Sequence, residues 1–330
     1  MKTSNGYDLM WTYIDAAKMP QMALSQSSDD CCEDPDYYDN ECGSCGTYDE
    51  YWDSPEGYLW SYGYKPFGSH YVDYVNGEFV TLPIDDNLNQ IIFGMELEAE
   101  YRSHDFDDVK TMLRYLNAAF GSVKNTSVAI WIAKEDSTVD VEFVSMPFTY
   151  GAWIAAQDIL QVAMSFAQKH FRGFFAESAG GHIHVAKSVL SLTTMYAWLQ
   201  FHYDNPGLIA DIAQRGIGPD ADWCYLQKPD ISVARIAKQK YGFPNRGALA
   251  DSHNTIEHRY FRSNLKLDRL NKNVEFLQSM YDYFSKLTYQ DMARDKAHKL
   301  VAYLGHVSLN QETYPSLYTF LQKKGYISCV

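Results

Sequence analysis

Residues 91–101 read Ile-Ile-Phe-Gly-Met-Glu-Leu-Glu-Ala-Glu-Tyr, so apolar and acidic residues alternate along this stretch. Successive side chains of a β-strand point to opposite faces of its sheet, and the alternation therefore predicts a strand with one buried face. The other face would carry the carboxylates of Glu96, Glu98 and Glu100. Each pair of such neighbouring charges costs roughly 1 kcal/mol in repulsion, unless a divalent cation such as Mg2+ is bound between them. A solvated acidic strand face is the alternative interpretation.

Three later stretches also predict strands that present charged or metal-binding side chains on one face. They are residues 139–145 with Asp140 and Glu142, residues 182–186 with His182 and His184, and residues 255–261 with Glu257 and Arg259. Two histidines two positions apart fit either a packed polar pair or a set of metal ligands. An arginine beside a carboxylate suits the stabilisation of a transferred phosphoryl group next to a metal ion. Four such strands in one chain are much less expected by chance than any single one.

The predicted strands are separated by helices of irregular length, which is typical of an α+β fold. Helices are expected at residues 105–121, 152–171 and 192–203, and in most of the chain after residue 268. Residues 127–133 and 139–145 are expected to pair as a hairpin. We expect an antiparallel sheet with helices packed on one side and a concave active-site face on the other. Because no linker divides them, residues 91–330 are predicted to form one such domain.

The N-terminal region, residues 1–90, differs in composition from the rest of the chain. Residues 21–68 are crowded with Asp, Glu, Tyr, Gly and Ser and show no hydrophobic periodicity. Their many aromatic residues argue against simple disorder, because aromatic side chains bury well. We interpret residues 21–68 as an irregular insertion or lid on the main domain.

Four of the six cysteines lie in this N-terminal insertion, as Cys31, Cys32, Cys42 and Cys45. A disulfide framework is the less expected use, because the first twenty residues do not predict a signal peptide. The four thiolates could together bind a zinc ion, since two cysteines separated by two residues can meet one ion from a tight turn. An acidic loop with reduced thiols is the alternative.

The formal net charge of −14 over 330 residues limits the classes of partner. Nucleic acids and anionic membranes attract basic surfaces, so neither is an expected partner. No apolar run is long enough to predict a membrane-spanning helix. We expect a soluble, cytoplasmic protein.

The ordered set of motifs resembles the amidoligase family of the glutamine synthetase and glutamate–cysteine ligase superfamily. Five short elements carry the resemblance, in the order in which the family has them, over roughly residues 93–276. Along the chain they are Gly94-Met-Glu96-Leu-Glu98, Glu142-Phe-Val-Ser145-Met-Pro147, Gly181-His182-Ile-His184, the helix-end Arg215 with the aromatic stretch at residues 223–225, and Ile256-Glu257-His258-Arg259. His258 departs from the pattern, since the family usually has phenylalanine there.

This resemblance implies a ligase that joins a carboxylate to an amine at the expense of ATP. An antiparallel sheet would form a funnel-shaped site for ATP and two or more Mg2+ ions. The substrate carboxylate would take the γ-phosphoryl group of ATP, and an amine would then displace phosphate to form an amide. The partners would therefore be small-molecule or peptide carboxylates and amines, whose identity the sequence does not specify.

The resemblance also implies roles for individual residues. The metal ligands would be Glu96, Glu98, Glu142, His182 and Glu257. The nucleotide or its phosphates would be contacted by His184, Ser188 and Arg259, and catalysis would involve Arg259 and Arg215. The incoming amine would also need a general base, and either Glu100 or an acid from the N-terminal insertion could serve. Arg246 and Arg262 flank the last catalytic strand and could bind a substrate carboxylate; ordinary surface arginines are the equal alternative.

Two other functions remain open from the sequence. A guanidino-kinase-like phosphotransferase would keep the nucleotide and metal sites but form no amide; the His-x-His and Glu-x-Arg strands fit amidoligases better. A non-catalytic binding or structural protein with a degenerate site is the second alternative. The presence of all the predicted metal ligands together with Arg259 argues against degeneracy.

Overall fold

A computed structural model describes most of the chain after residue 68. The described residues are 59–60, 69–85, 88–103, 105–126, 129–176, 179–221, 224–228, 232–240, 242, 247–252, 254–292 and 294–328. The predicted zinc ligands Cys31, Cys32, Cys42 and Cys45 lie outside the described residues. So do Arg246 and all of the 21–68 insertion except Leu59 and Trp60.

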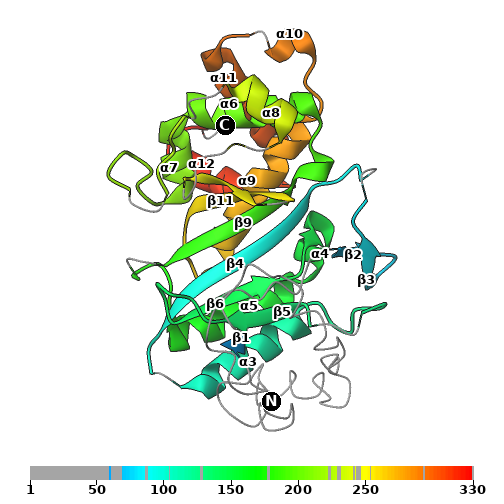
Figure 1. Ribbon diagram of the computed structural model, residues 1–330, viewed down its shortest axis with the longest axis vertical. Helices are drawn as coiled ribbons and strands as arrows, with labels where there is room; N and C mark the ends of the chain where they lie inside the picture. The colour runs from blue at the N-terminus through cyan, green and yellow to red at the C-terminus, as the bar shows by residue number, and fades with distance from the viewer. Residues whose placement is uncertain are drawn as a thin grey trace, which may run out of the picture.

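The described residues form an α+β fold with one large, mostly antiparallel sheet, so the α+β class predicted from the sequence is confirmed. The longest strand, β4 (Ile92–Tyr101), runs through the middle of the sheet (Figure 1). The strands on one side of it are β6 (Val141–Ser145), β5 (Trp131–Lys134) and β1 (Leu59–Trp60), and those on the other side are β9 (Gly180–Ala186), β11 (Thr255–Arg262) and β10 (Leu249–Ser252). All neighbours in this row are antiparallel except β1 and β5.

Short strands extend the sheet at both ends of β4. They are β7 (Phe148–Thr149), β2 (His70–Val75) and β3 (Glu78–Pro83) at its beginning, and β8 (Phe171–Arg172) at its end. The pair β2–β7 is parallel, so the sheet is mixed and not purely antiparallel as expected.

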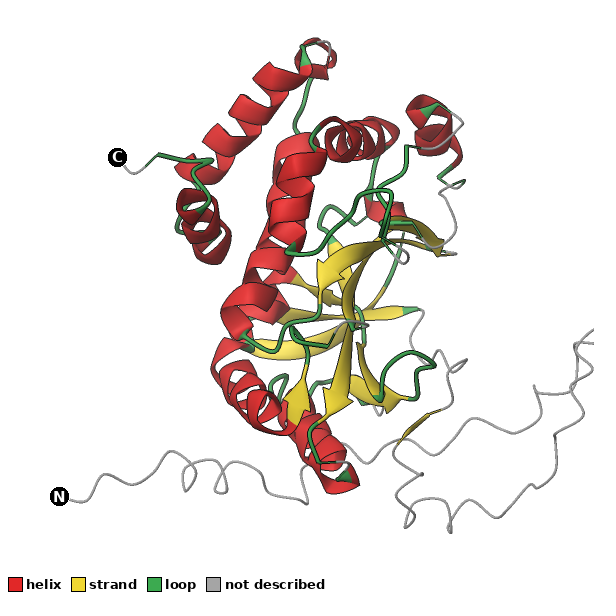
Figure 2. Ribbon diagram, turned by 90° about the vertical axis from the view of Figure 1, so that its left-hand side faces the viewer, coloured by secondary structure: helices red, strands yellow, loops and turns green. Residues whose placement is uncertain are grey.

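Helices gather mainly on one side of the sheet (Figure 2). Their bounds are α3 (Phe106–Ala118), α4 (Tyr150–Ala155), α5 (Gln157–His170), α6 (Leu192–Asp204), α7 (Pro206–Ala213), α8 (Val233–Gln239), α9 (Leu267–Phe284), α10 (Tyr289–Met292), α11 (Lys296–Leu309) and α12 (Pro315–Lys323). A 3-10 turn, η4 (Lys187–Val189), follows β9.

The apolar side chains of β4, Met95, Leu97 and Ala99, are buried as their alternation predicts.

The predicted helices at residues 105–121 and 192–203 are confirmed as α3 and α6, and Asp105 caps α3 by accepting a hydrogen bond from the backbone of Asp107. The single helix predicted at residues 152–171 is wrong. The chain breaks at Ala156 between α4 and α5.

Polar contacts with α9 accompany this break. The Gln157 side-chain amide donates to the carbonyl of Trp153 at 3.1 Å, and its oxygen accepts a hydrogen bond from Asn271 of α9 at 2.7 Å. Tertiary hydrogen bonds of this kind override a local helical pattern.

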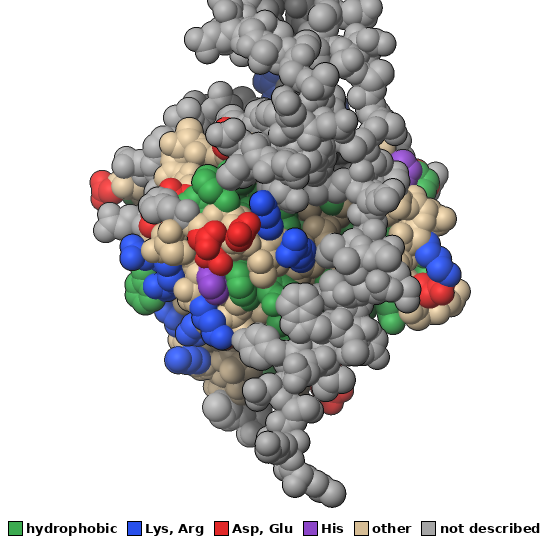
Figure 3. All heavy atoms as spheres, turned by 90° about the horizontal axis from the view of Figure 1, so that it is seen from below, with side chains coloured by type: hydrophobic (Ala, Val, Ile, Leu, Met, Phe, Trp, Pro, Cys, Tyr) green, Lys and Arg blue, Asp and Glu red, His purple; other side chains and the backbone are tan. Residues whose placement is uncertain are grey.

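The described part of the surface does not carry the negative charge evenly. The face seen in Figure 3 carries many lysine and arginine side chains, several of them beside acidic ones. A net charge of −14 therefore coexists with local basic regions.

A buried polar network fixes β11 against α6 on the helix-covered side of the sheet. The indole N–H of Trp198 donates to Nε2 of His258 at 3.1 Å, and Nδ1 of His258 donates to the carbonyl of Ile183 in β9 at 3.1 Å. His202 accepts a hydrogen bond from the Tyr260 hydroxyl at 3.0 Å. His258 and His202 have no exposed surface. His258 belongs to β11, the strand that carries Glu257 and Arg259, and its side chain faces the side opposite to Glu257.

We expect His258→Phe to lower the free energy of unfolding by about 1–3 kcal/mol, because the Trp198 indole and the Ile183 carbonyl would each lose a buried partner. Urea denaturation measures this change. The double variant Trp198→Phe/His258→Phe removes donor and acceptor together, so its loss should be smaller than the sum of the two single losses. A His258→Phe protein as stable as the unchanged protein would contradict this account.

Acid should destabilise the fold through His202, whose pKa burial lowers to about 4 from its ordinary 6.5. Below pH 6.5 the unfolded imidazole binds a proton while the folded one stays neutral, so stability is full above pH 6.5 and falls toward pH 4. Urea denaturation should show that the free energy of unfolding declines between pH 7.5 and pH 4. This decline should be smaller by about 3 kcal/mol in His202→Phe/Tyr260→Phe than in the unchanged protein. Parallel pH curves for the two proteins would disprove this assignment.

Candidate functional site

The predicted metal-binding side chains meet on one face of four neighbouring strands. The strand register places Glu98 of β4 opposite Glu142 of β6, and Glu96 of β4 opposite His182 of β9. Glu257 of β11 stands opposite His184 of β9. Residues directly opposite each other on paired strands project to the same face, so the pairing of β4, β6, β9 and β11 assembles a single cluster.

Burial separates this cluster from an ordinary acidic surface. Glu98 is 6%, Glu142 5%, His182 5% and Glu257 9% exposed. Carboxylates are almost never buried to this extent unless they are paired or bind a cation. The solvated strand face considered from the sequence therefore does not describe these residues.

His182 is the centre of the cluster. Its Nδ1 atom lies 3.2 Å from Glu96 Oε2 and 3.3 Å from Glu257 Oε1, and its Nε2 atom lies 3.5 Å from Glu98 Oε1. Three carboxylates from two strands therefore surround one imidazole.

His184 lies on the same face, next to Glu96 and Thr255. Its Nδ1 atom is 2.9 Å from the Thr255 hydroxyl. Its Nε2 atom is 3.0 Å from Glu96 Oε1, but this buried nitrogen has no hydrogen-bond partner in the described part of the chain. A buried nitrogen that faces a carboxylate without a hydrogen bond fits the place of a ligand to a cation.

The pKa values reflect an excess of negative charge. Burial alone would raise the pKa of Glu96, but His184 and His182 outweigh it and hold that pKa well below its usual value. Burial and the neighbouring Glu96 raise the pKa of Glu142 to about 8, against the effect of Lys134. Burial alone would lower the pKa of His182, yet Glu96, Glu98 and Glu257 raise it to about 9. In the absence of other cations, protons would compensate this charge.

Two overlapping groups of donor atoms could hold a metal ion. One is Glu96, Glu142 and His182, and the other is Glu96, His184 and Glu257; in each group the donor atoms lie within 4.8 Å of one another. Carboxylate oxygens suit Mg2+, and a mixed set of oxygens and imidazole nitrogens also suits Mn2+. The donors present therefore fit a divalent cation, and Glu96 belongs to both groups.

Glu98, which was also predicted to bind metal, belongs to neither group. One of its carboxylate oxygens accepts a hydrogen bond from the backbone N–H of Gly180. Glu98 therefore lies at the edge of the cluster, where it contacts His182 Nε2.

Arg259 and Arg215 border the cluster. Arg259 donates to Glu257 Oε1 at 2.5 Å, and its Nε atom is buried with no hydrogen-bond partner among the residues described. Arg215 follows α7 and comes close to Gly180 of β9. A Cβ atom added to Gly180 would lie 2.8 Å from His182 Nε2, 3.0 Å from the Arg215 guanidinium and 3.2 Å from Glu98 Oε2. The missing side chain of Gly180 therefore makes room for Arg215.

Three other predicted residues occupy other positions in the described structure. Glu100 is two residues beyond Glu98, opposite Arg172 of β8. Ser188 is half-buried in the turn η4. The Arg262 guanidinium stacks 4.2 Å from the centre of the Phe174 ring.

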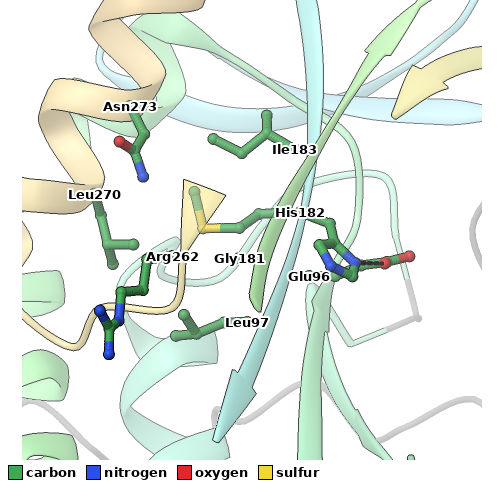
Figure 4. A pocket seen from close by; sticks show the side chains of 9 residues that line it. Glu96, Leu97, Gly181, His182, Ile183, Arg262, Leu270 and Asn273 are labelled. Carbon is green, nitrogen blue, oxygen red and sulfur yellow. Dashed lines mark hydrogen bonds and ion pairs between the residues drawn. The ribbon is translucent and has the colours of Figure 1, made fainter. Parts of the chain in front are cut away.

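Figure 4 shows why Arg262 is separate from the cluster. It lies with Leu270 and Asn273 of α9 on one side of β4 and β9, whereas the side chains of Glu96 and His182 lie on the other side. Arg262 lines a small cavity between the sheet and α9.

Sequence reasoning missed Lys134 of β5. It stands opposite Glu142 in the register of β5 and β6, and its ammonium lies 3.3 Å from Glu142 Oε2. The predicted hairpin did not reveal this pair, because a turn at residues 135–137 would place position 134 opposite 138, whereas the observed register places it opposite 142.

No protein-family model matches this chain, and neither does any curated protein. The resemblance to amidoligases therefore stays a hypothesis, and the function has to be argued from the site. Among the described helices, none combines the length and the apolar character needed to cross a bilayer.

Gly180→Ala should disturb the site more than the fold. Its Cβ would force His182, Arg215 and Glu98 apart, so we expect weaker Mn2+ binding and a loss of stability of about 1–3 kcal/mol. Calorimetric titration of Mn2+ and thermal unfolding test both effects.

Gly305→Ala in α11 is the matched control, because nothing lies within 4 Å of the added Cβ. It should leave Mn2+ binding unchanged and raise stability by about 0.5–1 kcal/mol. Equal Mn2+ binding by Gly180→Ala and the unchanged protein would contradict the proposed closeness of these side chains.

Proposed function

We propose that this protein is an ATP- and Mg2+-dependent carboxylate–amine ligase that forms an amide through an acyl phosphate. One observation carries the proposal. Four strands contribute a buried group of carboxylates and imidazoles to one sheet face, with Arg259 and Arg215 beside it. This arrangement agrees with what the resemblance to amidoligases implies.

The donor groups would hold Mg2+ with the triphosphate of ATP. Glu96, Glu142 and His182 would bind one ion, and Glu96, His184 and Glu257 the other. Bound Mg2+ supplies positive charge that lowers the repulsion between a carboxylate and the triphosphate. The sheet residues keep the donors fixed, because strands hold side chains more rigidly than loops do.

Arg259 is suited to the phosphoryl group in transfer. Glu257 holds one end of its guanidinium at 2.5 Å, which fixes its orientation. The buried Nε–H, which has no hydrogen-bond partner in the described residues, remains to donate to a phosphoryl oxygen. Charge-assisted hydrogen bonds from a preorganised arginine stabilise charge that develops in a transition state.

The proposed reaction has two steps. A substrate carboxylate oxygen attacks the γ-phosphorus, the bond from that phosphorus to the bridging oxygen of ADP breaks, and ADP leaves. An amine nitrogen then attacks the carbonyl carbon, loses a proton to a base and displaces inorganic phosphate. Glu100, on the same strand as Glu96 and Glu98, is our candidate for the base. The products are an amide, ADP and phosphate.

The purified protein should release phosphate from ATP and Mg2+ only when both a carboxylate and an amine are supplied. Mixtures of amino acids and short peptides, assayed for ADP and for free phosphate, provide the first screen. Glu96→Gln should reduce turnover at least about a hundredfold, since it weakens both donor groups. Glu312→Gln, at an exposed position, is the matched control and should keep full activity.

The two products discriminate between the functions. ADP formed without free phosphate, together with a phosphorylated acceptor, would replace the ligase with a phosphotransferase. Failure of a folded protein to bind an ATP analogue in the presence of Mg2+ would exclude both enzymes and favour a binding protein. Calorimetric titration of the analogue with and without Mg2+ measures that binding.

A further inference from the structure

A row of three charged side chains crosses β5, β6 and β4. Lys134 of β5 is directly opposite Glu142 of β6, and Glu142 is directly opposite Glu98 of β4. The Lys134 ammonium lies 3.3 Å from Glu142 Oε2. The row therefore places one fixed positive charge at its end, beside two carboxylates.

Lys134 and Glu142 form a buried ion pair. The two side chains are 8% and 7% exposed. Desolvation of both groups largely cancels the attraction in such a pair, and an apolar pair of similar size is often as stable. A gain in fold stability is therefore a weak reason for a lysine at this position, and the geometry around Glu142 offers a better one.

The two donor groups have the same design. Each contains Glu96 and one histidine, and each ends in a carboxylate that is held by its own cationic side chain. Arg259 holds Glu257 in one group, and Lys134 holds Glu142 in the other. Lys134 occupies the position that corresponds to Arg259 on the opposite side of the cluster, but it is more deeply buried.

We propose that Lys134 is a positioning residue for the cation site formed by Glu96, Glu142 and His182. It takes one oxygen of Glu142 and thereby turns the carboxylate so that the other oxygen serves the ion. Groups that hold a metal ligand in this way commonly contribute a factor of about 10 to 100 to metal affinity. The inference rests on the cation binding in the proposed function but does not depend on amide formation.

Mn2+ binding to the full-length protein tests this role. Free Mn2+ is measured by electron paramagnetic resonance in titrations of the unchanged protein and of the variants K134M, K134R, E142Q and K134M/E142Q. The unchanged protein should bind two ions. K134M should weaken one of the two sites about tenfold to a hundredfold and leave the other unchanged, and K134R should restore most of the loss.

The double variant decides whether Lys134 acts through Glu142. If it does, K134M/E142Q binds Mn2+ as weakly as E142Q and no more weakly. Because removal of one member of a buried ion pair destabilises a protein, thermal unfolding is followed for every variant. Neither E142Q nor K134M/E142Q has a carboxylate at position 142 that could be left unpaired. These two variants can therefore be compared even if K134M alone does not fold.

Several results would overturn the inference. K134M could leave both sites unchanged, or the losses of K134M and E142Q could multiply in the double variant. Tighter Mn2+ binding by K134M would mean that Lys134 competes with the ion for Glu142. Failure of the unchanged protein to bind any Mn2+ would instead remove the cation site of the proposed function itself, and this is seen before any variant is compared.

Discussion

The pairing of β4 with β6 and β9 is the constraint on which the rest of the structure depends. Antiparallel register on both sides of β4 sets which side chains stand opposite Glu96 and Glu98. A shift of either neighbour by one residue would turn every partner to the other face. The cluster therefore exists only in the observed register, and the buried apolar side chains behind it, such as Met95 and Leu97, fix that register.

The sheet separates two kinds of buried polarity. On the helix side, His258 and His202 are neutral, and each is hydrogen-bonded to partners that match it. On the other side, carboxylates, imidazoles and cationic side chains share charge within a few ångströms. The first network rigidifies β11, and the second leaves His184 Nε2 and Arg259 Nε buried without hydrogen-bond partners among the residues described. The hydrogen-bonded network on the helix side thus holds in place the strand whose other face carries the charged cluster.

The sequence predicted the faces of single strands well and their relations to one another poorly. Alternation along residues 91–101 places Glu96 and Glu98 opposite Met95 and Leu97, and the structure agrees. Alternation does not assign Arg262 to a face, because the register of β11 shifts between His258 and Phe261 and the simple period of two is lost there. The grouping of His182 with Glu142 depends on which strands pair. The break at Ala156 accompanies contacts with a helix more than a hundred residues away, and neither feature is encoded locally.

Glu96 belongs to both donor groups, and this has a thermodynamic consequence. Two ions that share one carboxylate cannot bind independently, because the first polarises the oxygen atoms that the second would use. By linkage, whatever factor the first ion imposes on the affinity of the second is returned by the second to the first. The site would then fill as a unit or discriminate strongly between its first and second ion, with a single side chain setting the degree of cooperativity.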